Sequence, residues 1–210
     1  MRVRITFQKT REIIYTSALD LQKIWERSLR RAQLEVKYSE GFHPLPKMQL
    51  AVPLPVGFKG KKELIDIWFT DTASKEEIQK RLQKNLPVGI DLISIEEIPD
   101  NYKALNGLAE SADYEVTVLD PEINFNTLRT SIHDLMKNKD IERERNKKRY
   151  NLRPLILTME VSISDNSLSQ IRMHLLARSG ASGRPDEVIK ELGIDPAVCE
   201  FERTLIYFHE

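Results

Sequence analysis

The stretch KMQLAVPLPVGFKGKKELIDIWFT, residues 47–70, decides the fold, because it contains two strand patterns joined by a short turn. Large apolar side chains occupy every second position, at Met48, Leu50 and Val52, and two prolines end that pattern. After a glycine-containing turn at residues 57–60, the alternation returns over residues 63–70. The two segments are therefore expected to pair as an antiparallel hairpin.

A strand and a helix are expected on each side of this hairpin. Residues 2–7 alternate like a half-buried strand, and Ser17 is suited to cap a helix that buries a stripe from Leu21 to Ala32. After the hairpin, residues 75–84 have the spacing of a second helix and residues 89–98 that of a fourth strand. The order β-α-β-β-α-β predicts a ferredoxin-like domain with both helices on one face of an antiparallel sheet.

The same pattern begins again after a polar connection. Strand patterns at residues 114–118, 157–163, 171–175 and 204–208 are interleaved with helical patterns at residues 125–136 and after Pro185. A charged segment, residues 137–153, is inserted between them. We therefore predict an α+β protein of two tandem ferredoxin-like domains, residues 1–100 and 113–210, with residues 101–112 as the linker.

Composition excludes several classes of function. Cys199 is the only cysteine, so neither an internal disulfide nor a cysteine-held iron–sulfur cluster is possible within this chain. The four histidines show no metal-ligand spacing, and no apolar run is long enough to span a bilayer. The first residues alternate like a strand and lack the apolar core of a signal peptide. We expect a cytoplasmic protein that binds no metal or cofactor and contacts no membrane.

Charge is strongly segregated along the chain although the net charge is zero. Residues 1–62 hold thirteen Lys or Arg against five Asp or Glu, and residues 137–153 hold eight against three. Residues 63–136 hold six against fifteen, and residues 154–210 hold five against nine. Two basic segments in acidic surroundings suit a polyanion or an acidic partner protein, or they are two solvated surfaces.

Three groups of side chains are candidates for contact with nucleic acid. They are the cations on one helix face, the cations and the aromatic ring on the helix-free face of the first sheet, and the cations of the charged ribbon. In that order they are Lys23, Arg27, Arg30 and Arg31; Arg2, Arg4, Lys47 and Trp68; and Lys147, Lys148 and Arg149. Alternatively, the helix face is only solvated, the sheet face packs on the second domain, and the ribbon protects an edge strand from aggregation.

The loop before the hairpin is the other candidate site. Tyr38, Ser39, Gly41, Phe42 and His43 lie in a connection too rich in breakers for a helix or strand, and they are expected to contact a substrate or a partner. The two aromatic rings either fix the loop on the core or form the lid of a hydrophobic cluster. With Ser39 or Asp66 nearby, His43 could act as a base, or it only bonds backbone carbonyls.

A second stretch suggests a catalytic residue. The segment GASGRPDEV, residues 180–188, resembles the catalytic segment of pseudouridine synthases, in which an aspartate attacks the base. The match would make Asp186 the nucleophile, although Pro185 and Glu187 depart from that motif. Ordinary helix initiation, with Pro185 at the first position and two acids in the first turn, explains the same residues.

The chain as a whole resembles a family of bacterial radical SAM-linked proteins of unknown function. The resemblance lies in RITFQKT (residues 4–10), in residues 21–57 with YSEGFHP as their most specific part, and in NLPVGIDL, NLRPLI and GRPDEVIKELG. It implies a partner, because members are encoded beside a radical SAM protein or fused to it. It also implies that SAM and an iron–sulfur cluster are bound by that partner, and it supplies no catalytic residues.

These features predict a non-catalytic adaptor or substrate-recognition module that works with a radical SAM protein, with tRNA or rRNA as the client. One alternative is an RNA-modifying enzyme in its own right, similar to pseudouridine synthases and using His43, Asp66 or Asp186. Another is a structural partner of the translation apparatus. Turnover by the isolated protein would separate the enzyme from the other two.

Overall fold

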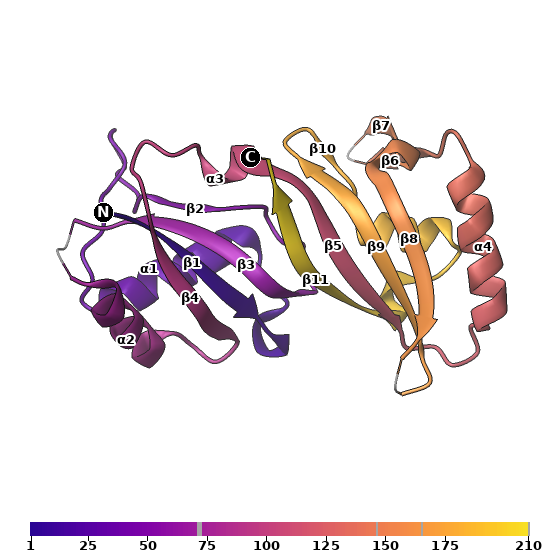
Figure 1. Cartoon of the computed structure of the whole chain (residues 1–210), viewed down its shortest axis with the longest axis horizontal. Helices are drawn as coiled ribbons and strands as arrows, with labels where there is room; N and C mark the ends of the chain where they lie inside the picture. The colour runs from indigo at the N-terminus through magenta and orange to yellow at the C-terminus, as the bar shows by residue number, and fades with distance from the viewer. Residues whose placement is uncertain (71–72, 146, 165, 210) are drawn as a thin grey trace. The chain divides into compact units, whose positions relative to one another are not determined.

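The computed structural model describes residues 1–70, 73–145, 147–164 and 166–209, and its elements are labelled in Figure 1. The chain divides into two compact units, residues 1–109 and residues 110–209. Both units combine helices with antiparallel strands, as expected for a mixed α and β protein.

The first unit is a four-stranded antiparallel sheet with two main helices. Its strands pair in the order β4, β1, β3, β2, and β2 pairs with β3 as the predicted hairpin. The elements are, in chain order, β1 (Arg2–Lys9), α1 (Ala18–Arg31), β2 (Met48–Leu50), β3 (Phe58–Trp68), α2 (Lys75–Asn85) and β4 (Ile90–Ile98).

Both helices of the first unit bury apolar side chains against the same face of this sheet. Ser17 caps α1 by accepting a hydrogen bond from the backbone N–H of Asp20 at 3.2 Å. Trp25 of α1 is fully buried and meets the ring of Phe7 edge to face, with ring centroids 5.1 Å apart. Ile78 and Leu82 of α2 join the same cluster, so one core lies under both helices.

The expected linker, residues 101–112, is partly folded. Residues Leu105–Leu108 form a short helix, α3, and β5 (Ala109–Val118) begins directly after it. The backbone N–H of Leu105 donates to the side-chain carbonyl of Gln49 at 2.8 Å, which ties α3 to β2. This segment therefore covers part of the first sheet on the face without α1 and α2.

The second unit repeats the strand order of the first. Strand β9 lies between β8 and β5, and β11 lies beside β5, so the order β8, β9, β5, β11 corresponds to β2, β3, β1, β4 of the first unit. The short β10 (Ala181–Ser182) also pairs with β9. The other elements are α4 (Phe125–Lys137), β6 (Glu142–Arg145), β7 (Lys148–Asn151), β8 (Ile156–Ile163), β9 (Ser169–Arg178), α5 (Pro185–Glu191) and β11 (Cys199–Phe208).

The two units differ most in one connection, between the first helix and the second strand of each. In the first unit this connection carries the loop of residues 36–47, and in the second unit it carries the hairpin of β6 and β7. The charged ribbon thus forms the hairpin arm that its alternating charges predict. The loop of residues 36–47 and the β6–β7 hairpin therefore both lie between the first helix and the second strand of the sheet of their own unit.

Candidate functional site

Residues 36–47, which we call the GFHP arm, form a narrow loop that is closed by main-chain hydrogen bonds. Tyr38 and Pro46 form an antiparallel bridge, and the backbone N–H of Ser39 donates to the carbonyl of Leu45 at 2.8 Å. The hydroxyl of Ser39 accepts from the N–H of Leu45 at 3.0 Å. At the base, the N–H of Lys37 donates to the carbonyl of Trp68 at 2.7 Å, which anchors the arm on β3. The arm is thus held by its backbone.

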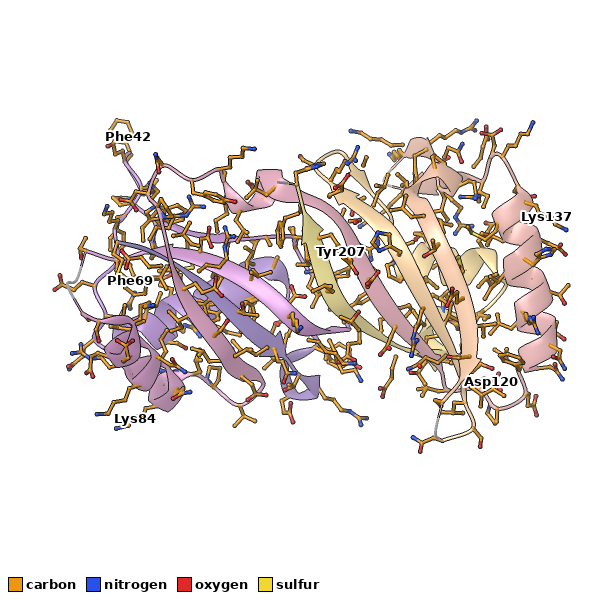
Figure 2. All side chains as sticks on the ribbon, in the orientation of Figure 1. Phe42, Phe69, Lys84, Asp120, Lys137 and Tyr207 are labelled. Atoms are coloured by element: carbon orange, nitrogen blue, oxygen red, sulfur yellow. The ribbon has the colours of Figure 1, made fainter. Side chains whose placement is uncertain are left out.

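The tip of the GFHP arm is exposed. Phe42 is fully exposed, and Figure 2 shows its ring pointing away from the ribbon. Gly41 has φ of +131°, a region that side chains with a Cβ rarely adopt. Phe42 therefore neither fixes the loop on the core nor covers a hydrophobic cluster, whereas Tyr38 is about half exposed. His43 is exposed too, and it has no hydrogen-bond partner among the residues that the structure describes.

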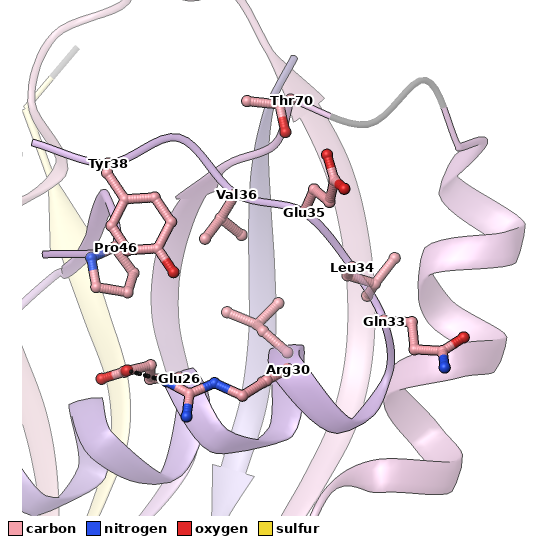
Figure 3. A pocket seen from close by; sticks show the side chains of 10 residues that line it. Glu26, Arg30, Gln33, Leu34, Glu35, Val36, Tyr38, Pro46 and Thr70 are labelled. Carbon is pink, nitrogen blue, oxygen red and sulfur yellow. Dashed lines mark hydrogen bonds and ion pairs between the residues drawn. The ribbon is translucent and has the colours of Figure 1, made fainter.

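A pocket of about 370 Å³ lies between the end of α1 and the base of the GFHP arm (Figure 3). Leu29, Leu34 and Val36 supply its apolar lining, and the ring of Tyr38 stands at its side. Arg30 donates to Glu26 at 2.8 Å along its rim. Polar and charged side chains make up about half of the lining, so the pocket is suited to bind a group that has both an apolar and a polar part.

The cations of α1 do not act as one group. Arg31 donates to the backbone carbonyl of Asn85 at 2.7 Å, so it connects α1 to the end of α2. Lys23, Arg27 and Arg30 are exposed. Arg30 is paired with Glu26, and Lys23 lies 3.9 Å from Asp20. All four predicted side chains are thus exposed, but the guanidinium of Arg31 is bonded to the main chain of α2.

The predicted platform on the first sheet is not open. Arg2 is 1% exposed and Asp66 is 0% exposed, and they contact each other at 2.6 Å. Arg4 donates to the same carboxylate at 2.8 Å. Arg2 also donates to the backbone carbonyls of Tyr102 and Lys103, which belong to the segment that covers this face. Asp66 is thus fully engaged in holding two arginines, and it is not placed to work as a base with His43.

Trp68 is part of the same cluster and offers no free face for stacking. The guanidinium of Arg2 lies 4.7 Å from the ring centroid, and the ammonium of Lys47 lies 4.8 Å from it. Trp68 itself is buried. Sequence patterns place these residues on one face correctly, but residues 102–108 close that face.

The candidates of the second unit are divided between structural and exposed positions. Arg184 donates to both oxygens of Asp186, at 2.9 and 2.8 Å, so this carboxylate is held at the start of α5. Lys147, Lys148 and Arg149 are exposed on the β6–β7 hairpin, whereas Arg143 of the same hairpin donates to Glu187 of α5 at 3.1 Å. The hairpin therefore exposes these three cations to solvent, while Arg143 ties it to α5.

Ion pairs at Glu187 strengthen the attachment of the β6–β7 hairpin to α5. Burial raises the pKa of Glu187, but hydrogen bonds from Lys190 and Arg143 outweigh it, so the pKa lies below its ordinary value. Glu187 thus stays ionised and keeps its ion pairs at neutral pH.

Burial raises the pKa of the Cys199 thiol to about 11, which disfavours its reactive thiolate.

One cluster was not anticipated from the sequence. His174, Asp113 and Tyr207 contact one another in the second unit, although 61 and 94 residues separate Asp113 from the other two. Only the alternation of β5 and β9, which places Asp113 and His174 on one sheet face, could have pointed to this pair. Among the described residues there is no group of His, Cys, Asp and Glu that could hold a metal ion. No helix formed by the described residues is long and apolar enough to cross a membrane.

Comparisons with known proteins give a family and a related fold. Residues 2–185 match the family described as "Uncharacterized protein conserved in bacteria (DUF2344)". A chain from the crystal structure of a Cbf5–Nop10–Gar1 complex is similar with a TM-score of 0.52 and 11% identity, over 97% of this chain and 48% of that chain. A chain of an archaeal box H/ACA sRNP Nop10–Cbf5 complex has a TM-score of 0.48 and 12% identity, over 98% and 48%.

The chain thus spans about half the length of these two solved chains, and the first of them shows a related fold alone. No curated protein matches the sequence.

Proposed function

Because the chain belongs to this family of uncharacterized bacterial proteins (DUF2344), we propose its function from its own surfaces. We propose a non-catalytic adaptor that docks on a radical SAM protein through the GFHP arm and helps it act on a tRNA or rRNA client in the cytoplasm. The radical SAM partner, which would supply SAM and its cluster, is taken from the sequence resemblance. We also propose that both units are ferredoxin-like, because each has the same strand order.

The exposure of Phe42 is the observation that carries the docking proposal. Tyr38 and Leu45 of the same arm are exposed as well, so Phe42 is part of a group of exposed apolar side chains, and aromatic side chains are frequent anchors of interfaces. The arm is already ordered by the bonds between Ser39 and Leu45, so little conformational entropy is lost on binding. The pocket beside the arm could take an apolar side chain of the same partner.

We expect Phe42→Asp to weaken binding of the radical SAM protein by about 30-fold or more, which corresponds to a hot spot of about 2 kcal/mol. Binding can be measured by co-purification at moderate salt and then by calorimetry with the purified pair. Tyr15→Asp is the matched control, since Tyr15 is also an exposed aromatic side chain but lies outside the arm. Equal affinity of both variants and the wild type would exclude the arm as the docking site.

The exposed cations of α1 carry the RNA part of the proposal. Neutralising Lys23, Arg27 and Arg30 with glutamine should reduce the salt dependence of RNA binding, because each lost phosphate contact removes about 0.7–0.9 units of slope. The measurement is a filter-binding series over salt with tRNA and with rRNA fragments. Glutamine at Lys147, Lys148 and Arg149 is the comparison variant. RNA would be ruled out as the client if neither variant changed affinity or slope.

A further inference from the structure

A histidine, an aspartate and a tyrosine meet on one face of the second unit's sheet. Asp113 of β5 and His174 of β9 are direct cross-strand neighbours, and Nδ1 of His174 lies 2.5 Å from Oδ1 of Asp113. The hydroxyl of Tyr207 donates to the other carboxylate oxygen at 2.7 Å, and the tyrosine and histidine rings meet edge to face with centroids 5.0 Å apart. This face lies opposite the buried side chains of Tyr114 and Met173.

The carboxylate fixes the orientation and the tautomer of the imidazole. An ionised carboxylate only accepts hydrogen bonds, so Nδ1 of His174 carries the proton that it donates to Asp113. In the neutral ring Nε2 is then the acceptor. Tyr207 stays a donor at neutral pH, because its hydrogen bond to Asp113 raises the pKa of the phenol. Nε2 has no hydrogen-bond partner in residues 1–70, 73–145, 147–164 and 166–209.

His174 and Asp113 line a pocket of about 350 Å³. Its polar lining includes Thr158 and Glu160 of β8, Arg172 of β9 and Thr204 of β11. Arg172 lies 3.5 Å from Glu115, so its charge is partly balanced. With Asp113, Glu115 and Glu160 on the same face, the pocket repels a phosphate more than it attracts one. A neutral group that donates to Nε2 and accepts from a hydroxyl or guanidinium fits better.

We propose that this pocket binds the hydrogen-bonding edge of an unpaired nucleobase, with a ring N–H donating to Nε2 of His174 and the adjacent carbonyl accepting from Thr158 or Arg172. Uracil carries this pair of groups on one edge. The site would hold one nucleotide of a single-stranded client, as sheet faces with ring side chains do in RNA-binding domains. The proposal rests on the RNA client only for the source of the base, since the pocket itself can be tested with a free nucleoside.

The test is an NMR titration of the ¹⁵N-labelled full chain with uridine, which reports on the ring nitrogens of His174. We expect the Nε2 signal of His174 to move and saturate with a Kd of about 1 mM, which is a common affinity for a ligand held by a few hydrogen bonds. His174→Gln assigns the signal and should abolish binding. His133→Gln is the control, because His133 also lies beside an aspartate but is exposed on α4, and this variant should still bind uridine. Asp113→Ala should change the ring signals even without ligand, because the acceptor at Nδ1 is lost.

Ligand variants keep the test decisive even if His174→Gln fails to fold. 3-Methyluridine lacks the ring N–H, so on the wild-type protein it should lose the Nε2 shift. Equal shifts with 3-methyluridine or with methyl riboside would assign the site to sugar hydroxyls and overturn the nucleobase. Uridine monophosphate should bind no tighter than uridine. No shift with uridine at all would also overturn the proposal. Phe42→Asp should bind uridine normally, so failure of the docking proposal would be seen separately.

Discussion

Replacing Asp66 with asparagine is expected to lower the free energy of unfolding of the first unit by about 3–5 kcal/mol, the range for removing one partner of a buried ion pair. The carboxylate is 0% exposed and accepts hydrogen bonds from both Arg2 and Arg4. An asparagine of the same shape leaves the guanidinium of Arg2 buried without an opposite charge. The measurement is urea unfolding followed by circular dichroism, with the midpoint and slope compared to the wild type.

Asp100→Asn is the matched control for this substitution. Asp100 also faces a cation, Lys37 at 3.3 Å, but both side chains are about half exposed. Exposed ion pairs contribute about 0–1 kcal/mol, so the control should unfold close to the wild type. Similar small losses for both aspartates would mean that the Arg2 cluster does not hold the first sheet together.

The second large effect is expected at the centre of the first core. Trp25→Ala should destabilise the first unit by about 3–5 kcal/mol, because it removes a fully buried indole from between α1 and β1 and leaves a cavity. The ring pair with Phe7 is lost with it. The same urea series measures the loss, and the slope tests whether unfolding remains cooperative.

Trp25→Phe separates volume from hydrogen bonding at this position. The indole N–H of Trp25 is buried without a partner among the described residues, and such a donor costs about 1–3 kcal/mol. Phenylalanine removes this donor and keeps an aromatic ring against Phe7. We therefore expect a loss well below that of alanine, and equal losses for the two variants would mean that the ring contact with Phe7 adds nothing to stability.

Sequence patterns predicted the strands and helices because the spacing of apolar residues follows the face of each element that is buried. The alternation of β1 and of residues 63–68 of β3, and the stripe of α1, recur because one face of each packs on the shared core. The beginning of β3 was missed, because residues 57–60 read as a turn although the strand starts at Phe58, which is buried. Glycine in a strand interior imitates a turn signal.

The site residues were harder to predict, because their environments are set by segments distant in sequence. Arg2 reads as an exposed strand cation, and only the carbonyls of Tyr102 and Lys103 show that it is buried. Arg31 reads as part of a cationic stripe, but its partner is the last residue of α2. His174 gave no local signal at all, since its carboxylate partner lies on another strand.

The shared position of the GFHP arm and the β6–β7 hairpin has an evolutionary consequence. If the two units descend from one duplicated ancestor, their arms are the same element, which diverged toward an apolar tip in one copy and a cationic hairpin in the other. Such a connection can change length without altering the strand order, so each copy was free to acquire its own specificity. Exchanging the arms between the units would then transplant recognition while leaving both sheets intact.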